Sequence, residues 1–218
     1  MTAIKICGLS DEAAHAAARE AGAEYVGFVF FPPSPRAVTP DQAGAIGAPG
    51  GKLRVGPLRV GLFVDPDDAL LASAIPAARL DLVQLHGHET PARVAEVRQK
   101  FGLKVIKVLP VATAEDVAAA AGYAAADFLM FDAKPPPGAA LTGGNAQTFD
   151  WTVLRGVRIG KPWFLAGGLH AGNVAEAIRI ARPTVADVSS GVEATRGVKD
   201  PARIRAFIAA VRAADAAG

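Results

Sequence analysis

The chain has 218 residues, of which 51% are hydrophobic and 20% are charged, and its formal net charge at pH 7 is +2. A chain of this length and apolar content can bury a substantial core, which excludes an intrinsically disordered protein. The charges are spread along the sequence without a basic cluster, so we expect no nucleic-acid partner and no membrane surface.

The cysteine content and the N-terminal residues indicate a cellular compartment. Cys7 is the single cysteine of the chain, so it cannot form an internal disulfide. This is typical of proteins from a reducing environment. The first residues lack the basic region and the apolar core of a signal peptide, and no apolar run is long enough to span a bilayer. We therefore expect a cytoplasmic protein.

Short apolar runs recur along the chain, and each is followed by a polar or glycine-rich turn. The runs occupy residues 3–7, 25–30, 59–64, 80–85, 104–108, 127–131, 161–166 and 184–188. Apolar runs of this kind, bounded by turn residues, are typical of strands that are buried on both faces. We therefore predict eight buried strands at nearly regular intervals.

Alanine-rich segments with helical spacing lie between these runs. They span residues 11–22, 65–78, 90–102, 113–124, 171–181 and 200–214. Ser10 and Thr90 precede two of them, and we expect their hydroxyl groups to cap the free amides at the helix start. Gly22 and Gly102 lie where two of the helices are expected to end.

Strict alternation of strand and helix predicts a parallel sheet. Eight repeats favour a closed (β/α)8 barrel, the TIM barrel, built as a single domain over residues 1–218. The alternative is an open doubly wound sheet, but the first turn, CGLS at 7–10, lacks the glycine-rich pattern of that fold. The active site of a barrel lies at the carboxyl ends of its strands. We therefore expect the long loops at 31–40 and 132–151 to be active-site loops.

Cys7 and Asp132 lie at the carboxyl ends of the first and sixth predicted strands. A cysteine in this position is either an inert small hydrophobic residue or a reactive group. Lys5 lies two residues earlier on the same face of the strand, and we expect its ammonium to lower the pKa of Cys7. Asp132 is either a helix cap, a salt-bridge partner or, enclosed by the long loop, a proton donor. Because the two strands lie on different sides of the barrel mouth, a substrate can lie between base and acid.

Two kinds of candidate anion-binding residue follow the second, seventh and eighth predicted strands. Arg36 lies between prolines in the second loop and is either a solvated surface residue or a rigid, bidentate partner for a carboxylate. Small residues after the seventh and eighth strands allow backbone amides to approach a phosphate. These residues are Gly167, Gly168, Ser190 and Gly191, and Gly144 in the sixth loop is expected to add a further amide.

Two polar residues at strand ends have more than one interpretation. His86 lies in the sequence HGHE, which suggests a metal site, but a structural or substrate contact is favoured because few further ligands are available. Asp187 lies within the last strand and is expected either to neutralise Lys5 or to contact the sugar. Lys107 and Asp81 are expected to be satisfied within the layers of the barrel.

Short motifs follow one another along the chain from the first predicted strand to the last predicted helix. They are KICGL at 5–9, GFVF at 27–30, SPR at 34–36, VGLFVD at 60–65, QLHGHE at 84–89, FDA at 131–133, GGN at 143–145, TFDW at 148–151, LAGGL at 165–169, NV at 173–174, SSGVE at 189–193 and GVKD at 197–200. Together they resemble the phosphoribosylanthranilate isomerase family over the whole chain.

This resemblance implies roles for individual residues. Cys7 corresponds to the general base of the family, Asp132 to its general acid, and Arg36 to the residue that contacts the anthranilate group. The residues that it assigns to the phosphate are Gly167, Gly168, Ser190 and Gly191. The sixth loop departs from the family pattern, because Ala146 stands where a second glycine often follows the glycine pair. We therefore expect this loop to be stiffer or slightly displaced.

The implied activity is an aldose–ketose isomerisation in tryptophan biosynthesis, the Amadori rearrangement of N-(5-phosphoribosyl)anthranilate to 1-(2-carboxyphenylamino)-1-deoxyribulose 5-phosphate. It proceeds by general acid–base catalysis, with no cofactor or metal expected. The alternatives are indole-glycerol-phosphate synthase, the isomerase of the histidine pathway, activity on both aminosugars, and a binding module without catalysis. Cys7 at the rim disfavours the first two, and the presence of both base and acid disfavours the last. The expected partner is a small phosphorylated sugar, bound by a monomer or homodimer.

Overall fold

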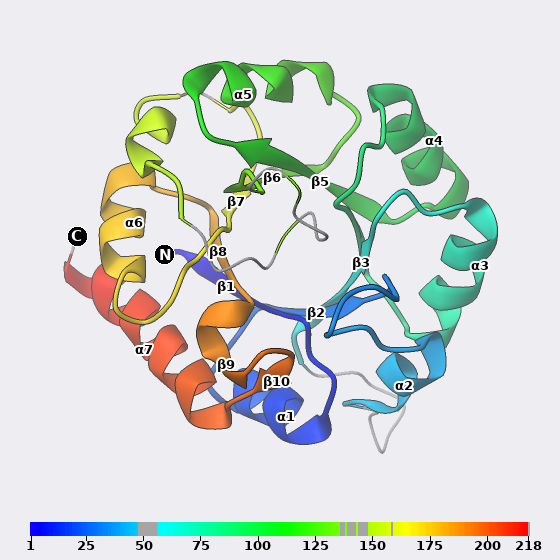
Figure 1. Cartoon of the computed structure of the whole chain (residues 1–218), viewed down its shortest axis with the longest axis horizontal. Coiled ribbons are helices and arrows are strands. Elements are labelled where there is room, and N and C mark those ends of the chain that lie inside the picture. The colour runs from blue at the N-terminus through cyan, green and yellow to red at the C-terminus, as the bar shows by residue number, and fades with distance from the viewer. Residues whose placement is uncertain (48–55, 136–137, 139–142, 144–147, 158, 218) are drawn as a thin grey trace.

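A closed barrel of eight parallel strands forms the centre of the molecule (Figure 1). The computed structural model describes residues 1–47, 56–135, 138, 143, 148–157 and 159–217. The strands are β1 Ala3–Cys7, β2 Tyr25–Val29, β3 Leu58–Phe63, β4 Leu82–Leu85, β5 Lys104–Val111, β6 Phe128–Ala133, β7 Trp163–Leu165 and β8 Val185–Val188. They pair in chain order, and β8 pairs with β1 to close the barrel. The predicted (β/α)8 barrel and its eight strands are confirmed.

Helices surround the barrel (Figure 1). They are α1 Glu12–Glu20, α2 Pro40–Ala45, α3 Asp68–Ala77, α4 Pro91–Phe101, α5 Ala114–Ala118, α6 Val174–Ala181 and α7 Pro201–Ala217. The six predicted helices are present, although the one expected over 113–124 continues from α5 as the 3-10 helix η1 Ala119–Gly122. Sequence analysis missed helix α2, which begins at the end of the long loop at 31–40. It also missed the hairpin of β9 Glu193–Thr195 and β10 Val198–Lys199 after β8.

The helix ends correct one expectation and confirm others. The N-cap of α1 is Asp11, whose carboxylate accepts a hydrogen bond from the amide of Ala14, so the prediction of Ser10 as the cap is wrong. Thr90 caps α4 as predicted. Gly102 ends α4 with a φ of 68°, a left-handed conformation that glycine adopts without strain.

The hydrophobic core has one part between strands and helices and another inside the barrel. Because side chains alternate across a strand, Ile4 and Ile6 face the helices whereas Lys5 and Cys7 face the barrel interior. The interior is filled by Val60, Leu82, Ile106, Val108, Met130, Phe164, Ala166 and Val185. This apolar filling supports the ring of polar residues above it at the carboxyl ends of the strands.

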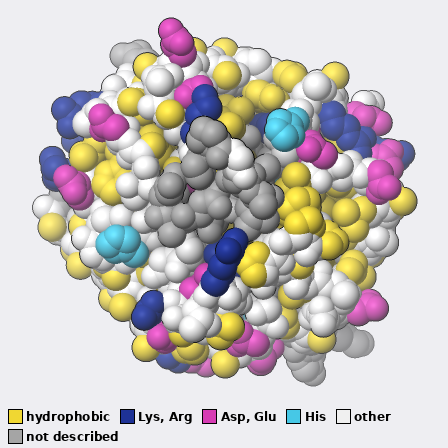
Figure 2. All heavy atoms as spheres, in the orientation of Figure 1, with side chains coloured by type: hydrophobic (Ala, Val, Ile, Leu, Met, Phe, Trp, Pro, Cys, Tyr) yellow, Lys and Arg dark blue, Asp and Glu magenta, His cyan; other side chains and the backbone are white. Residues whose placement is uncertain are grey.

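Acidic and basic side chains alternate around the rim of the face that Figure 2 shows. On that face, residues of one charge sign do not gather into a single patch among the residues that the structure describes. None of the described helices is both long enough and apolar enough to cross a membrane.

Candidate active site

A pocket opens at the carboxyl ends of the strands, and both Cys7 of β1 and Asp132 of β6 line it. Other predicted site residues that line the pocket are Arg36, His86, Gly167, Gly168, Asp187 and Ser190. Gly191 directly follows Ser190, and the prediction for Gly144 lies outside the described residues. Residues from six strands or their following loops are thus brought together around one pocket.

Cys7 lies beside a buried ion pair at the top of the barrel interior. The Lys5 ammonium donates a hydrogen bond to Asp187 over 2.9 Å, so Asp187 does neutralise Lys5. Burial raises the pKa of Cys7, whereas the nearby Lys5 lowers it, and the first effect is larger. The expectation of a lowered thiol pKa is therefore wrong in its net direction, although the influence of Lys5 has the expected sign.

Gly27 provides the room that Cys7 and Lys5 occupy. It pairs with Cys7 in the register of β1 and β2. A Cβ atom at this position would lie 3.0 Å from the Cys7 sulfur and 3.3 Å from Cε of Lys5. A larger residue in this part of β2 would therefore displace the thiol.

Asp132 faces His86 within the wall of the pocket. Its Oδ1 accepts a hydrogen bond from the amide of Ala133 over 2.8 Å, and its Oδ2 lies 3.2 Å from Nε2 of His86. The Asp132 and His86 side chains are only 9% and 10% exposed. Gly143 of the sixth loop packs against this pair, since a Cβ atom there would lie 2.8 Å from Oδ2 and 2.7 Å from Nε2. The acid candidate is thus held in a crowded site with one polar neighbour that can exchange a proton.

Sequence analysis missed Gln84, which faces the same pocket from β4. The residue is 1% exposed, and its Nε2 lies 3.2 Å from Nδ1 of His86. If the amide donates to Nδ1, the proton of a neutral His86 is on Nε2, toward Asp132. Gln84 could have been found from the sequence, because a polar residue at an inward position of an otherwise apolar strand indicates a polar pocket.

Arg36 is buried and paired with a carboxylate of the chain itself. Its Nε and Nη2 donate to the two carboxylate oxygens of Glu193 over 2.5 Å and 3.0 Å. Lys199 also donates to Glu193, over 2.8 Å. Burial raises the pKa of Glu193, but the Arg36 hydrogen bond and Lys199 outweigh this effect and lower the pKa to about 2. The surface alternative for Arg36 is therefore wrong, and sequence analysis missed its partners Glu193 and Lys199.

The loops after β7 and β8 pack against each other at the other side of the pocket. Gly167 and Gly168 have φ values of 87° and 60°, which other residues rarely adopt. A Cβ atom on Gly191 would lie 2.0 Å from the carbonyl oxygen of Leu169, so only glycine fits there. Among the described residues, no acceptor takes the amide protons of Gly168, Ser190 and Gly191. These amides can therefore donate to an anion in the pocket.

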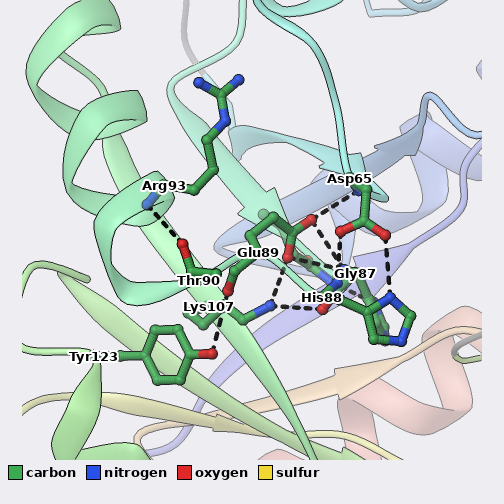
Figure 3. Close-up of polar contacts among 10 residues, drawn as sticks. Asp65, Gly87, His88, Glu89, Thr90, Arg93, Lys107 and Tyr123 are labelled. Carbon is green, nitrogen blue, oxygen red and sulfur yellow. Dashed lines mark hydrogen bonds and ion pairs between the residues drawn. The ribbon is translucent and has the colours of Figure 1, made fainter.

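A buried network supports the loop that carries His86 (Figure 3). Lys107 of β5 donates to Glu89 over 2.5 Å and to the carbonyl oxygen of Gly87 over 2.8 Å. Glu89 in turn accepts hydrogen bonds from the amides of Gly87 and Asp65. Lys107 is therefore satisfied, as expected. It alternates with Ile106 and Val108 of the interior, so it faces outward from the barrel and not into its layers.

His88 of the same loop is exposed and faces Asp65, whose Oδ2 lies 3.2 Å from Nδ1 of His88 (Figure 3). Within the part of the chain that the structure describes, no group of three or more His, Cys, Asp or Glu side chains could hold a metal ion. The polar neighbours of His86 are Gln84 and Asp132, and its structural or substrate-contact role stays a prediction.

Lys107→Met is expected to lower the free energy of unfolding by about 3–5 kcal/mol, because it leaves the buried Glu89 carboxylate without its counter-ion. Urea unfolding followed by circular dichroism measures this change. Lys100→Met is the matched control, since it removes an ammonium that is 53% exposed and paired with Asp68 at the surface. Equal, small effects of the two substitutions would contradict a structural role for the buried pair.

The comparisons with known proteins agree on one family. A family model described as N-(5'phosphoribosyl)anthranilate (PRA) isomerase matches residues 4–210. The N-(5'-phosphoribosyl)anthranilate isomerase of Paramagnetospirillum magneticum is 58% identical over 212 residues, which cover 96% of each chain. The isomerase of Rhodospirillum rubrum is 55% identical over 214 residues, which cover 97% of this chain and 98% of the relative.

Solved structures of such isomerases share the fold over nearly the whole chain. The phosphoribosyl anthranilate isomerase of Thermotoga maritima superposes with a TM-score of 0.86 at 34% identity, covering 98% of this chain and all of that chain. A phosphoribosyl anthranilate isomerase in complex with reduced 1-(o-carboxyphenylamino)-1-deoxyribulose 5-phosphate has a TM-score of 0.82 at 31% identity, with the same coverage.

Proposed function

Since the chain belongs to the family of N-(5'-phosphoribosyl)anthranilate isomerases, we propose that Cys7 and Asp132 are the base and the acid of its reaction. The activity is the isomerisation of N-(5-phosphoribosyl)anthranilate to 1-(2-carboxyphenylamino)-1-deoxyribulose 5-phosphate in tryptophan biosynthesis. The observation that supports the action of both residues on one substrate is that they line one pocket from β1 and β6. The proposed catalytic domain comprises the whole barrel, residues 1–218.

Asp132 opens the sugar ring in this proposal. Its carboxylic acid gives a proton to the furanose ring oxygen, the bond from that oxygen to C1 breaks, and a Schiff base forms between C1 and the amine nitrogen. Cys7 as thiolate then removes the proton from C2, and the electron pair of that bond neutralises the iminium to give an enolamine. The enolamine tautomerises to the ketose. Asp132 gives one proton to the substrate, Cys7 takes one from it, and the tautomerisation moves the proton of the C2 hydroxyl to C1, so no oxidant or reductant is needed. Each positioned proton transfer can contribute roughly 10²–10⁴-fold to the rate.

The remaining residues hold the two ends of the substrate. Gly167, Gly168, Ser190 and Gly191 are proposed to bind the phosphate through backbone amides. Arg36 is proposed to contact the carboxylate of the anthranilate group, at the wall of the pocket formed by β2 and the β8 loop. His86 and Asp187 line the same pocket and are proposed to contact the sugar hydroxyl groups. We propose that this binding mode holds the substrate carbons C1 and C2 between Asp132 and Cys7.

Loss of substrate fluorescence on addition of the purified protein tests the activity directly. Rapid loss, with formation of the carboxyphenylamino ketose in equal amount, is the expected result. A protein that binds the substrate but leaves its fluorescence unchanged would contradict the isomerase assignment.

Gly191→Ala is expected to raise KM by about 10–100-fold, because the new methyl group overlaps the Leu169 carbonyl and separates the two phosphate loops. Competitive inhibition by inorganic phosphate should weaken in parallel. The control is Gly122→Ala on η1, where a Cβ atom would meet only Cγ of Pro91, at 3.8 Å. Wild-type phosphate inhibition in the Gly191 variant would remove these loops from the phosphate site.

One solved relative, the phosphoribosylanthranilate isomerase of Thermotoga maritima, is described as dimeric. For this chain, a monomer or homodimer stays a prediction, which sedimentation velocity at two protein concentrations can check.

A further inference from the structure

Gln84 is a polar residue of the barrel interior that lies beside His86 and the candidate acid. It is 1% exposed. Leu82 occupies the previous inward position of β4, Ile106 is the partner of Gln84 in the register of β4 and β5, and Met130 contacts it from β6. An amide in such apolar surroundings costs free energy unless its hydrogen bonds are made. The few acceptors around it therefore determine its orientation.

The two amide protons of Gln84 have two acceptors. Nε2 lies 3.2 Å from Nδ1 of His86 and donates to Sδ of Met130 over 3.6 Å. The reversed amide would place the carbonyl oxygen against the sulfur, which has no proton to donate, and would remove both protons from these acceptors. In the observed orientation, Oε1 is the one atom of the amide without a partner among the described residues. The surroundings thus favour donation from Nε2 to Nδ1 of His86.

A donor at Nδ1 determines the protonation of His86. The nitrogen presents its lone pair to the amide and therefore carries no proton. A neutral imidazole then has its proton on Nε2. The imidazolium is disfavoured, because its Nδ1 proton would meet the amide protons of Gln84. One hydrogen bond from Gln84 thus selects both the neutral form of the ring and its tautomer.

Nε2 of His86 faces the carboxyl group of Asp132. It lies 3.2 Å from Oδ2, but the contact lacks the alignment of a hydrogen bond, and Nε2 has no hydrogen-bond partner among the described residues. Its N–H is therefore available to a carboxylate that forms at Asp132. Asp187 also lines the pocket, but Lys5 offsets its charge over 2.9 Å. The carboxyl group with which His86 can exchange a proton is thus that of Asp132.

We propose that Gln84 is a positioning residue, which holds His86 neutral with its proton on Nε2, so that the transferable proton of the pair stays on Asp132. This rests on the proposed role of Asp132 as the general acid. When Asp132 gives its proton to the ring oxygen, Nε2–H donates a hydrogen bond to the new carboxylate, and His86 neither gains nor loses a proton. The alternative is that Gln84 only fills space in the barrel interior.

Nuclear magnetic resonance of the histidine nitrogens tests the tautomer without turnover. Long-range proton–nitrogen correlation spectra distinguish a ring nitrogen that carries a proton from one that does not. The chain has 4 histidines, and the signals that disappear in His86→Asn are those of His86. For the wild type at neutral pH we expect a bare Nδ1 and a protonated Nε2. A proton on Nδ1, in the neutral ring or in an imidazolium, overturns the inference.

Gln84→Met removes the amide and keeps an unbranched side chain. We expect a proton to appear on Nδ1 of His86 and kcat to fall about 10-fold, the effect of one lost hydrogen bond. The Kd of reduced 1-(2-carboxyphenylamino)-1-deoxyribulose 5-phosphate, an unreactive analogue of the product, should stay within about threefold. Wild-type kcat, or an unchanged tautomer, would leave Gln84 with a space-filling role.

Ile106→Val is the matched control. It alters the packing at the register partner of Gln84 but keeps the amide, so it should retain the wild-type tautomer and kcat. Gln84→Asn withdraws the amide from Nδ1 by one methylene and is expected to act like Gln84→Met, which covers a Met variant that fails to fold. Equal losses of kcat in Ile106→Val and in the Gln84 variants would contradict a positioning role.

A double-mutant cycle shows whether Gln84 acts through His86. If it does, Gln84→Met lowers kcat by less than about twofold in a protein that already carries His86→Asn. An undiminished loss there overturns the inference, because Gln84 would then act on the substrate or on Cys7. Wild-type activity in Asp132→Asn overturns instead the assignment of the acid, whereas an inactive Asp132→Asn with a proton on Nδ1 of wild-type His86 overturns this inference alone.

Discussion

Replacing Cys7 by serine is expected to lower kcat by about 10²–10⁴-fold, the contribution of a positioned proton transfer. The hydroxyl is close in size to the thiol, but it ionises far less readily and cannot act as the base at C2. Cys7 is buried, lines the pocket and has Lys5 beside it to stabilise the thiolate. Single-turnover loss of substrate fluorescence measures the chemical step without a contribution from product release. Ala3→Ser, at the start of the same strand, controls for a hydroxyl added to β1.

The pH profile of kcat/KM tests whether the loss of kcat in Cys7→Ser is due to the missing thiol. Burial outweighs the effect of Lys5 and raises the pKa of Cys7, so the free protein holds mainly the neutral thiol at neutral pH. Because the thiolate is the reactive form, kcat/KM of the wild type should rise with pH through and beyond about 8.5, the ordinary thiol pKa. This rise should be absent in Cys7→Ser. The same rise in both proteins would place the base elsewhere.

The strands could be predicted from the sequence because a parallel barrel buries both faces of each strand. Such strands are continuous apolar runs, and their constant spacing with intervening helices determines the fold. The short helix α2 was missed because its capping residues, Thr39 and Gln42, follow a proline-rich loop without an apolar stripe. The hairpin of β9 and β10 has strands of three and two residues, too short for any periodic pattern.

Some of the site residues could be predicted from the sequence, and others could not. Cys7 and Asp132 could be predicted because strand ends in a barrel converge on the active site, a property of the topology. The pair of Arg36 and Glu193 could not, because nothing local in either segment specifies a partner that lies 157 residues away. The net direction of the Cys7 pKa shift also depends on burial, which competes with the charge of Lys5 and is set by Gly27 and the neighbouring strands.

Asp132→Asn is expected to lower kcat by about 10²–10⁴-fold while the Kd of the reduced product analogue stays within about threefold. Asparagine keeps the shape of the side chain and the oxygen that accepts from the Ala133 amide, but it has no acidic proton for the ring oxygen. Fluorescence loss gives kcat, and calorimetry with the analogue shows whether the pocket is intact. A loss of binding equal to the loss in rate would indicate a damaged pocket and not a missing acid.

His86 is a second candidate for the general acid. Its Nε2 lies 3.2 Å from the Asp132 carboxylate, inside the same crowded site under Gly143, and an imidazolium can also donate a proton to an oxygen. If Asp132 is the acid, His86→Asn should cost less in kcat than Asp132→Asn, since it removes a neighbour and leaves the proton donor. A larger loss for His86→Asn, with Asp132→Asn within about tenfold of the wild type, would move the acid to the imidazole and make Asp132 the residue that orients it.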